Sequence, residues 1–204
     1  MGDVQLLPPV LAVYYGGQTG FQLGGNDNLF DFTEVSNVAH AHHLATAALL
    51  ATYERLGSGQ ASPLDHEKVD GEAFFVTNDS PIYFWDFARR AWRELGSTGG
   101  ASGAWVLPKD VGLLIATIME WTCWFTKKGP PKLTKQGVTY SCITRYYNID
   151  KAKRRLGYRP IVSLDEGIRR GARDAVYRGA IPGQPQELKG NADILKNGIP
   201  AAKR

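Results

Sequence analysis

Apolar residues recur at intervals of three and four positions between residues 35 and 57, the spacing that places side chains on one face of an α-helix. The repeating positions are Val38, Ala41, Ala45, Ala48 and Leu49. Gly57 follows them and is typical of the end of a helix. The pattern therefore predicts a helix over residues 35–57.

Extended segments are predicted on both sides of a turn that precedes this helix. Residues 19–33 read TGFQLGGNDNLFDFT, in which two short apolar segments flank Gly-Asn-Asp-Asn. Because Gly and Asn tolerate the positive φ angles of tight turns, this arrangement predicts a β-hairpin.

A strand and a helix are predicted after the first long helix. Residues 72–78, EAFFVTN, form a short apolar run typical of a buried strand. Residues 80–96 predict a helix with Ser80 as its N-cap and Pro81 in its first turn. This order is half of a β-α unit, and the Gly-rich residues 96–103 predict a flexible linker.

The C-terminal part of the chain predicts three further elements. Residues 138–148 alternate as a strand does, residues 149–157 predict a short basic helix, and residues 163–179 predict a helix capped by its first residue, a serine. Large apolar periodicity ends at position 181. We therefore expect one domain over residues 1–180 and a flexible tail over residues 181–204.

The apolar stretch VGLLIATIMEWTCWF, residues 111–125, allows two interpretations. It is shorter than the ~20 apolar residues that span a bilayer, and Glu120 interrupts it. It is either a buried helix of a globular core or a helix that lies in a membrane interface, with lysines facing anionic lipid. The second interpretation makes residues 103–135 a membrane-surface insertion. The aromatic residues at headgroup depth would then be Trp105, Trp121 and Trp124.

Composition narrows the class of protein only a little. With 204 residues, 43% hydrophobic and 11% aromatic, the chain can bury a core and is not intrinsically disordered. A net charge of +4 suits an enzyme, a membrane-surface protein and a weak nucleic-acid binder equally well. Cys123 and Cys142 show no Cys-x-x-Cys spacing, which favours a reducing compartment. The first ten residues lack the pattern of a secretory signal.

Tyr147 and Lys151 have the Tyr-x-x-x-Lys spacing that short-chain dehydrogenases use for proton transfer. In that chemistry, one helical turn places the ammonium beside the phenol and lowers the pKa of the phenol. Here Asn148 and Asp150 are typical cap residues, so Lys151 is expected in a first helical turn with Tyr147 outside the helix. We therefore predict no catalytic residue in this chain and a solvated face for the neighbouring Lys153, Arg154 and Arg155.

Two other motifs are weak. His40, His42 and His43 lie close together, but no further ligand at standard spacing accompanies them, so no metal site is predicted. GSGQAS, residues 57–62, imitates a dinucleotide loop but follows a helix and lacks the third glycine. No cofactor-binding residue is therefore assigned.

Three segments carry a resemblance to a known family. They are NLFDFTEVSNVAHAHHLA, GEAFFVTNDSPIYFWDFARRAW and RYYNIDKAKRRLGYRPIVSLDEGIRR. In register and in order, residues 2 to about 177 resemble the C-terminal half of the 3β-hydroxysteroid dehydrogenase/isomerase family of extended short-chain dehydrogenases, and most of all its fungal branch acting on 4α-carboxysterols.

The resemblance implies an α/β fold, here the C-terminal part of an extended short-chain dehydrogenase with an incomplete Rossmann-type domain and a substrate lobe. It implies oxidation of the 3β-hydroxyl of a sterol with NAD or NADP, followed by loss of the 4α-carboxylate. It also implies a place at the cytosolic side of the endoplasmic reticulum membrane or on lipid droplets.

The family's cofactor loop and its catalytic Ser, Tyr and Lys belong to an N-terminal half that this sequence does not show. We therefore expect a truncated reading of a longer gene, inactive alone. The segment GDVQLLPPVL corresponds to the family's loop into the substrate lobe. Asp3, Gln5, Leu6 and Leu7 are thus weak candidates for sterol contact, with packing as the alternative role. Glu34 stands where the family motif usually has Tyr.

Three functions remain open at this point. The first is the substrate-side part of a sterol dehydrogenase, and the second is a non-catalytic membrane-surface or sterol-binding module. The third, a nucleic-acid binder using KAKRRLGYR, has suitable charge but no recognisable binding fold, so no nucleic-acid partner is predicted.

Overall fold

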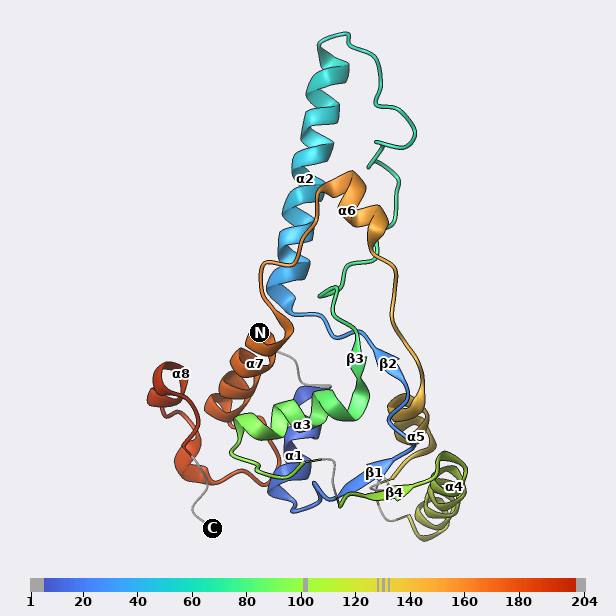
Figure 1. Cartoon of the computed structure of the whole chain (residues 1–204), viewed down its shortest axis with the longest axis vertical. Helices are drawn as coiled ribbons and strands as arrows, with labels where there is room; N and C mark the ends of the chain where they lie inside the picture. The colour runs from blue at the N-terminus through green and yellow to red at the C-terminus, as the bar shows by residue number, and fades with distance from the viewer. Residues whose placement is uncertain (1–5, 101–102, 128, 130, 132, 201–204) are drawn as a thin grey trace. The chain divides into compact units, whose positions relative to one another are not determined.

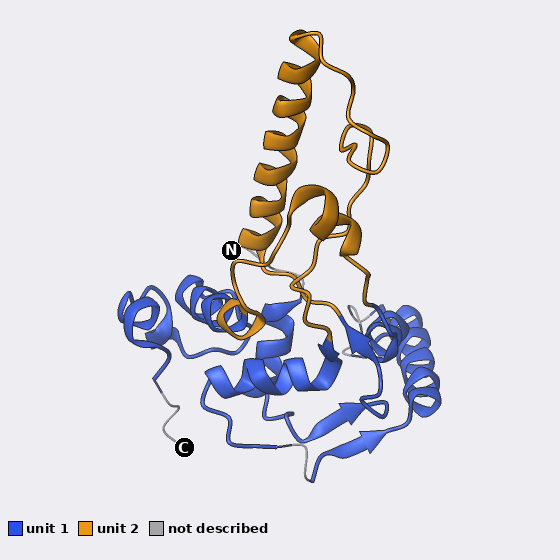
Figure 2. Ribbon diagram, turned by 45° about the horizontal axis from the view of Figure 1, so that its top comes forward, with its two compact units in different colours: residues 1–30, 82–145, 168–204 blue, residues 31–81, 146–167 orange. Residues whose placement is uncertain are grey.

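The computed structural model describes residues 6–100, 103–127, 129, 131 and 133–200. The chain divides into two compact units (Figure 2). Unit 1 combines Met1–Phe30, Ile82–Arg145 and Ile168–Arg204, and unit 2 combines Asp31–Pro81 and Tyr146–Gly167. The structure is mixed, with many helices and small sheets (Figure 1).

Unit 1 holds most of the elements. Its helices are α1 (Leu7–Tyr15), α3 (Phe84–Glu94), α4 (Lys109–Thr126), α5 (Lys135–Cys142), the 3-10 helix η1 (Gln186–Leu188) and α8 (Asp193–Asn197). Its strands are β1 (Phe21–Leu23), β2 (Leu29–Phe30), β3 (Ile82–Tyr83) and β4 (Trp105–Leu107). Unit 2 holds α2 (Val35–Gly57) and α6 (Asp150–Leu156), and α7 (Leu164–Arg178) begins in unit 2 and ends in unit 1.

The hairpin predicted over residues 19–33 is wrong, although both of its extended segments form. β1 pairs in parallel with β4, and β2 pairs antiparallel with β3. The connection is held by distant partners instead, because Asn28 Nδ2 donates to the carbonyl oxygens of Ser141 and Ile143. The residues between β1 and β2 therefore connect the two strands without pairing them, and hydrogen bonds to distant segments hold this connection.

α3 begins at Phe84, and Ser80 and Pro81 are not its cap as predicted. Tyr83 occupies the N-cap position without a side-chain hydrogen bond. Asn26 Oδ1 accepts from the main-chain N–H of Trp85 at 2.9 Å, so the cap comes from the β1–β2 connection. Ser80 does not cap the helix because Ile82 and Tyr83, which follow it, pair with β2.

The strand predicted over residues 138–148 is also wrong, because α5 covers its first half. Thr134 caps this helix by accepting a hydrogen bond from the N–H of Gly137. Val138 is fully buried in a cluster with Leu23, Leu107 and Ala116. Burial of one helical face thus outweighs the β propensity of Val and Thr.

Residues 181–200 carry local structure in the part of the chain for which the sequence predicted a flexible tail. They contain η1 and α8, and the side chains of Ile181 and Ile194 are 2% and 1% exposed. The N–H of Gly190 also donates to the carbonyl oxygen of Tyr177 on α7. A segment without a helical repeat thus still buries two apolar side chains.

Unit 2 confirms the predicted helices over residues 35–57 and 149–157, although Gly57 lies within α2 and Ser58 is its C-cap. Glu34, and not a Ser or Asn, caps α2 by accepting from the N–H of Ser36 at 2.6 Å. Its side chain lies against α7, since a Cβ on Gly167 would lie 2.9 Å from Glu34 Cγ. The core of unit 2 consists of Ala41, Val69, Ile149, Ala152, Leu156 and Tyr158.

Residues 72–78 do not form the predicted buried strand. They run as an extended segment in which Phe74 and Val76 are half-buried and Phe75 is 59% exposed. The side chains therefore alternate as in a strand, but in the described part of the chain no strand pairs with them.

A pair of buried asparagines joins the separate segments of unit 2. Asn37 Nδ2 donates to Asn78 Oδ1 at 2.9 Å and to the carbonyl oxygen of Val162 at 2.8 Å. Asn37 Oδ1 accepts from the N–H groups of Ile161 and Val162, and Asn78 Oδ1 also accepts from the N–H of Glu34. Asn37 therefore has a structural hydrogen-bonding role.

Replacement of Asn37 by Ala should destabilise unit 2 strongly. It leaves the N–H groups of Ile161 and Val162 without partners and removes one hydrogen bond to Asn78 Oδ1, at a cost of roughly 2–3 kcal/mol. Thr46→Ala, at an exposed position of the same helix, is the matched control and should change stability by under about 0.5 kcal/mol. Urea unfolding followed by circular dichroism measures both, and equal losses would contradict the assignment.

Candidate functional site

The exposed face of α4 carries a row of large apolar side chains. The row consists of Val111, Leu114, Ile118, Trp121 and Phe125, which are between 43% and 83% exposed. Their spacing of three and four residues places them on one helical face. We call this row the apolar stripe. Trp124 lies beside it on the helix and is 78% exposed.

The opposite face of α4 fixes how the helix is turned. Gly112 and Ala116 are buried there. A Cβ on Gly112 would lie 3.3 Å from side-chain atoms of Leu23 and Val138, so the helix packs closely. Because this narrow face alone is buried, α4 is not the buried core helix of the first interpretation.

Polar groups lie at the ends of the apolar stripe. Lys109 and Lys127 are exposed at the two ends of α4. Glu120 accepts a hydrogen bond from the main-chain N–H of Lys135 and pairs with its ammonium at 3.3 Å, and these contacts lower the pKa of Glu120. An open depression beside the stripe is lined by Glu120, Cys123, Trp124, Lys127, Gly129 and Pro131.

Neither α4 nor any other helix among the described residues combines the length and the hydropathy that are needed to cross a membrane.

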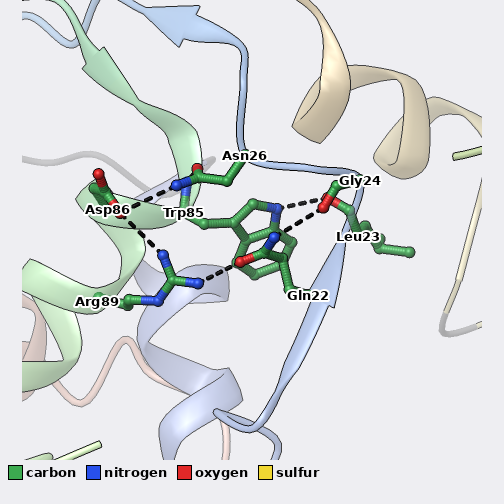
Figure 3. A network of polar contacts seen from close by, with 7 residues as sticks. All are labelled: Gln22, Leu23, Gly24, Asn26, Trp85, Asp86 and Arg89. Carbon is green, nitrogen blue, oxygen red and sulfur yellow. Dashed lines mark hydrogen bonds and ion pairs between the residues drawn. The ribbon is translucent and has the colours of Figure 1, made fainter. Parts of the chain in front are cut away.

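A buried polar network lies where β1 meets α3 (Figure 3). Arg89, 7% exposed, donates to Asp86 at 2.9 Å and to Gln22 Oε1. Asn26 Nδ2 donates to the same oxygen of Asp86 at 3.1 Å, and Gln22 Nε2 donates to the carbonyl oxygen of Gly24. The network holds the β1–β2 connection on the first turns of α3.

Trp85 adds a further link, because its Nε1 donates to the carbonyl oxygen of Leu23 at 2.7 Å. The sequence analysis did not single out these residues. The spacing of Asp86 and Arg89, three positions apart on a helix, was the one signal that could have indicated an ion pair.

Tyr147 and Lys151 lie as the sequence predicted, with Tyr147 before α6 and Lys151 in its first turn. The ring of Tyr147 stacks on Phe75 with 4.5 Å between centroids. Lys151 Nζ instead donates to Glu72 and to the carbonyl oxygen of Ala73. The two groups thus serve separate packing roles.

Two of the three residues on the basic face predicted on α6 form ion pairs. Lys153 pairs with Asp79 at 2.7 Å, and Arg155 pairs with Glu72 at 2.9 Å. Hydrogen bonds from Lys151 and then Arg155 lower the pKa of Glu72. Arg154 remains exposed.

Asp31 is the one described residue with a buried side-chain oxygen that has no hydrogen-bond partner, its Oδ1. Its Oδ2 accepts from the main-chain N–H of Tyr147 at 2.8 Å. Burial raises the pKa of Asp31, and the charge of Asp79 adds to the rise, while the N–H of Tyr147 opposes it. Burial likewise raises the pKa of Tyr158 to about 12, and its hydroxyl donates to the carbonyl oxygen of Thr77.

His40, His42 and His43 lie on α2. His42 Nδ1 is 2.8 Å from the carbonyl oxygen of Val38, and the centroid of the His40 ring lies 6.2 Å from that of the Tyr158 ring. Among the described residues no cluster of three or more His, Cys, Asp and Glu side chains could hold a metal ion.

Two of the four sterol candidates, Asp3 and Gln5, lie outside the described residues. Leu7 is buried, and its Cδ2 lies 2.6 Å from where a Cβ on Gly171 would be. Leu6 is half-buried at the N-cap of α1. The structure thus packs Leu7 tightly and leaves Leu6 more accessible.

Comparison with known proteins gives one family match. The 3-beta hydroxysteroid dehydrogenase/isomerase family matches residues 1–109. The decarboxylating sterol-4-alpha-carboxylate 3-dehydrogenase of Schizosaccharomyces pombe is 46% identical over 171 residues, which cover 83% of this chain and 45% of the relative. No solved structure matches the chain significantly.

Two further relatives are also decarboxylating sterol-4-alpha-carboxylate 3-dehydrogenases. The Saccharomyces cerevisiae protein is 41% identical over 167 residues, 82% of this chain and 44% of the relative. The Mus musculus protein is 31% identical over 171 residues, 82% of this chain and 42% of the relative. The chain therefore spans less than half the length of these relatives.

Asp31→Asn tests the electrostatics of unit 2. Because burial raises the folded-state pKa of Asp31 above 3.8, the carboxylate opposes folding once pH rises through that pKa. The variant keeps an acceptor for Tyr147 and loses the charge, so it should be more stable than the parent at pH 7. Urea unfolding should show this advantage shrinking as pH falls through the raised folded-state pKa and nearly absent below 3.8. An advantage independent of pH would contradict the explanation.

Proposed function

Because the chain belongs to the 3-beta hydroxysteroid dehydrogenase/isomerase family, we propose that it forms the substrate-side part of a decarboxylating sterol-4α-carboxylate 3-dehydrogenase. The family is NAD(P)-dependent in general. The observation that carries the proposal is the 46% identity to the S. pombe enzyme over 83% of this chain.

The proposed reaction has two balanced steps. In the first, the 3β-hydroxyl of the sterol would be oxidised to a 3-ketone by loss of a hydride from C3 and a proton from oxygen, for which NAD or NADP would supply the hydride acceptor. In the second, the bond between C4 and the carboxylate breaks, carbon dioxide leaves, and the ketone accepts the electron pair. The ketone is thus the electron acceptor that allows the carboxylate to leave as carbon dioxide.

The described residues do not fit the dinucleotide. No glycine-rich loop among them leads from a strand into the N-terminus of a helix. The GSGQAS sequence instead lies at the C-terminal end of α2, where exposed carbonyl groups disfavour phosphate. We therefore assign no step of hydride transfer to this chain.

The fold agrees with this role at a coarse level, as a mixed helical structure with small sheets. We propose the finer assignment of an incomplete Rossmann-type domain with a substrate lobe. Residues 72–78, which are unpaired here and are followed along the chain by α3, support it through the order of an apolar segment and a helix. Leu6 is the described residue proposed for sterol contact, since Leu7 is occupied in packing.

We further propose that the apolar stripe of α4 lies on a membrane surface, at the endoplasmic reticulum or a lipid droplet. Exposed tryptophans suit the depth of lipid headgroups. Lys109 and Lys127 at the helix ends suit anionic lipid, and the stripe suits the acyl boundary. This exposure also favours the alternative function, a non-catalytic membrane-surface or sterol-binding module.

A chimera tests the dehydrogenase proposal. In the S. pombe relative, the matching part of this chain would replace the 171 matched residues. The purified chimera should form NAD(P)H and release carbon dioxide in equal amounts when given a 4α-carboxysterol. The reason is that the chain would restore the substrate side of a complete enzyme.

The chain alone is the control and should form no NAD(P)H with the same sterol. A chimera that unfolds cooperatively and yet shows no sterol-dependent turnover would contradict the proposed activity. Sterol or vesicle binding by that inactive chimera would favour the non-catalytic module.

Flotation with liposomes tests the membrane proposal. The chain should float with vesicles that contain phosphatidylserine, and raised salt should weaken binding because it screens the lysines. Ile118→Asp together with Trp121→Asp should abolish flotation, since both residues lie in the apolar stripe.

The matched control is Leu50→Asp with Tyr53→Asp, which removes two exposed apolar side chains of α2 and adds the same charge. These substitutions should leave flotation unchanged. If both double variants lose binding equally, adhesion is nonspecific and the assignment to α4 is wrong.

A further inference from the structure

An open depression of about 400 Å³ lies at the C-terminal end of α4. Four of its lining residues come from this end of the helix: Glu120, Cys123, Trp124 and Lys127. They stand at positions i, i+3, i+4 and i+7, which is the spacing of a single helical face. Small-ligand sites commonly have volumes of about 300–1,000 Å³, so the depression is large enough for one. We call it the α4 depression.

Three features of the α4 depression attract a cation. The main-chain N–H of Lys135 and then its ammonium lower the pKa of Glu120, which keeps this carboxylate ionised. The last turn of an α-helix presents carbonyl groups without helical partners, and their partial negative charge favours positive ligands. Trp124 is 78% exposed, and the indole face is the aromatic surface that attracts cations most strongly. The depression therefore suits an organic cation.

The surroundings of Glu120 favour a cation that has no N–H groups. One carboxylate oxygen already accepts from the main-chain N–H of Lys135, and the other pairs with its ammonium. The sulfur of Cys123 and the ring of Trp124 offer soft, weakly polar contacts. An ammonium with N–H donors would find few free acceptors here, whereas a quaternary ammonium needs only charge and apolar contact.

Lys127 supplies the opposite charge. It is the C-cap of α4 and is exposed, and no ion pair with another described residue engages its ammonium. A lysine ammonium is a common partner of phosphate groups. With Glu120 and Lys127 on one face, the depression complements a zwitterion that joins a quaternary ammonium to a phosphate.

The apolar stripe indicates what such a zwitterion is attached to. The stripe runs beside the α4 depression, since Trp121 follows Glu120 and Phe125 follows Trp124 along the helix. A lipid would place its polar headgroup in the depression and its acyl chains along the stripe. A lipid therefore fits these two neighbouring surfaces better than a free zwitterion does.

We propose that the α4 depression binds the phosphocholine headgroup of phosphatidylcholine. The trimethylammonium group lies against Trp124 and Glu120, and the phosphate lies against Lys127. This inference rests on the proposed membrane-surface role of α4 and names the lipid that the surface selects.

Titration with short-chain lipids tests this selection. Dihexanoylphosphatidylcholine and dihexanoylphosphatidylethanolamine would each be added to the full chain below their micelle-forming concentrations, and binding would be followed by calorimetry. The acyl chains are identical, so the ratio of the two dissociation constants reports on the headgroup alone. The parent chain should prefer phosphatidylcholine about fivefold or more, because the ring and the carboxylate favour a quaternary ammonium.

Trp124→Leu keeps an apolar side chain, removes the ring and should bring the two dissociation constants to within about twofold of each other. Glu120→Gln keeps an acceptor for the N–H of Lys135, removes the charge and should weaken phosphatidylcholine binding about threefold or more. Tyr53→Leu, which removes an exposed ring of α2, is the matched control and should keep the parent's preference. Circular dichroism checks that each variant is folded.

Three outcomes would overturn the proposal: no binding of either lipid, equal affinity of the parent for both lipids, and a preference that survives Trp124→Leu. The flotation experiment is read separately. Flotation without headgroup preference would remove the phosphocholine site and leave the membrane-surface role in place. Headgroup preference without flotation would support the site and contradict that role.

Discussion

Unit 2 depends on one constraint, the burial of two side-chain amides that must satisfy each other. Asn37 and Asn78 lie 41 residues apart, yet their donors and acceptors interlock with the main chain at Val162. A buried amide without partners costs far more than an exposed one, so the three segments hold together only in one alignment. The position of the first turn of α2 relative to residues 161–162 follows from this pair.

The same amide pair also positions two neighbouring parts of unit 2, residues 72–78 and the start of α2. Asn78 ends the extended segment that begins at Glu72, and Asn78 Oδ1 also fixes the main chain of Glu34 at the start of α2. Next to Asn78, the carbonyl oxygen of Thr77 accepts from Tyr158, and that of Ala73 accepts from Lys151 on α6.

The sequence predicted those elements whose signals are local. α2, α6 and the helix capped by Ser163 follow from apolar spacing and cap residues within one or two turns. The strand pairings were not predictable in this way, because Asn28 finds its acceptors 113 and 115 residues away. The cap of α3 by Asn26 is of the same kind, 59 residues distant. In the candidate site, the tryptophans of α4 could be named from the sequence, but which face was open depended on Gly112 fitting against Leu23 and Val138.

The contact between Glu34 and Gly167 has a consequence for how such sequences can diverge. Glu34 Cγ occupies the space that any side chain at position 167 would need, and the same Glu34 caps α2. A larger residue at 167 is thus tolerated only with a smaller or redirected residue at 34, which must bring another cap for the helix. The two positions, 133 apart in the sequence, should therefore covary, and a change at either alone should be rare among sequences that keep this packing.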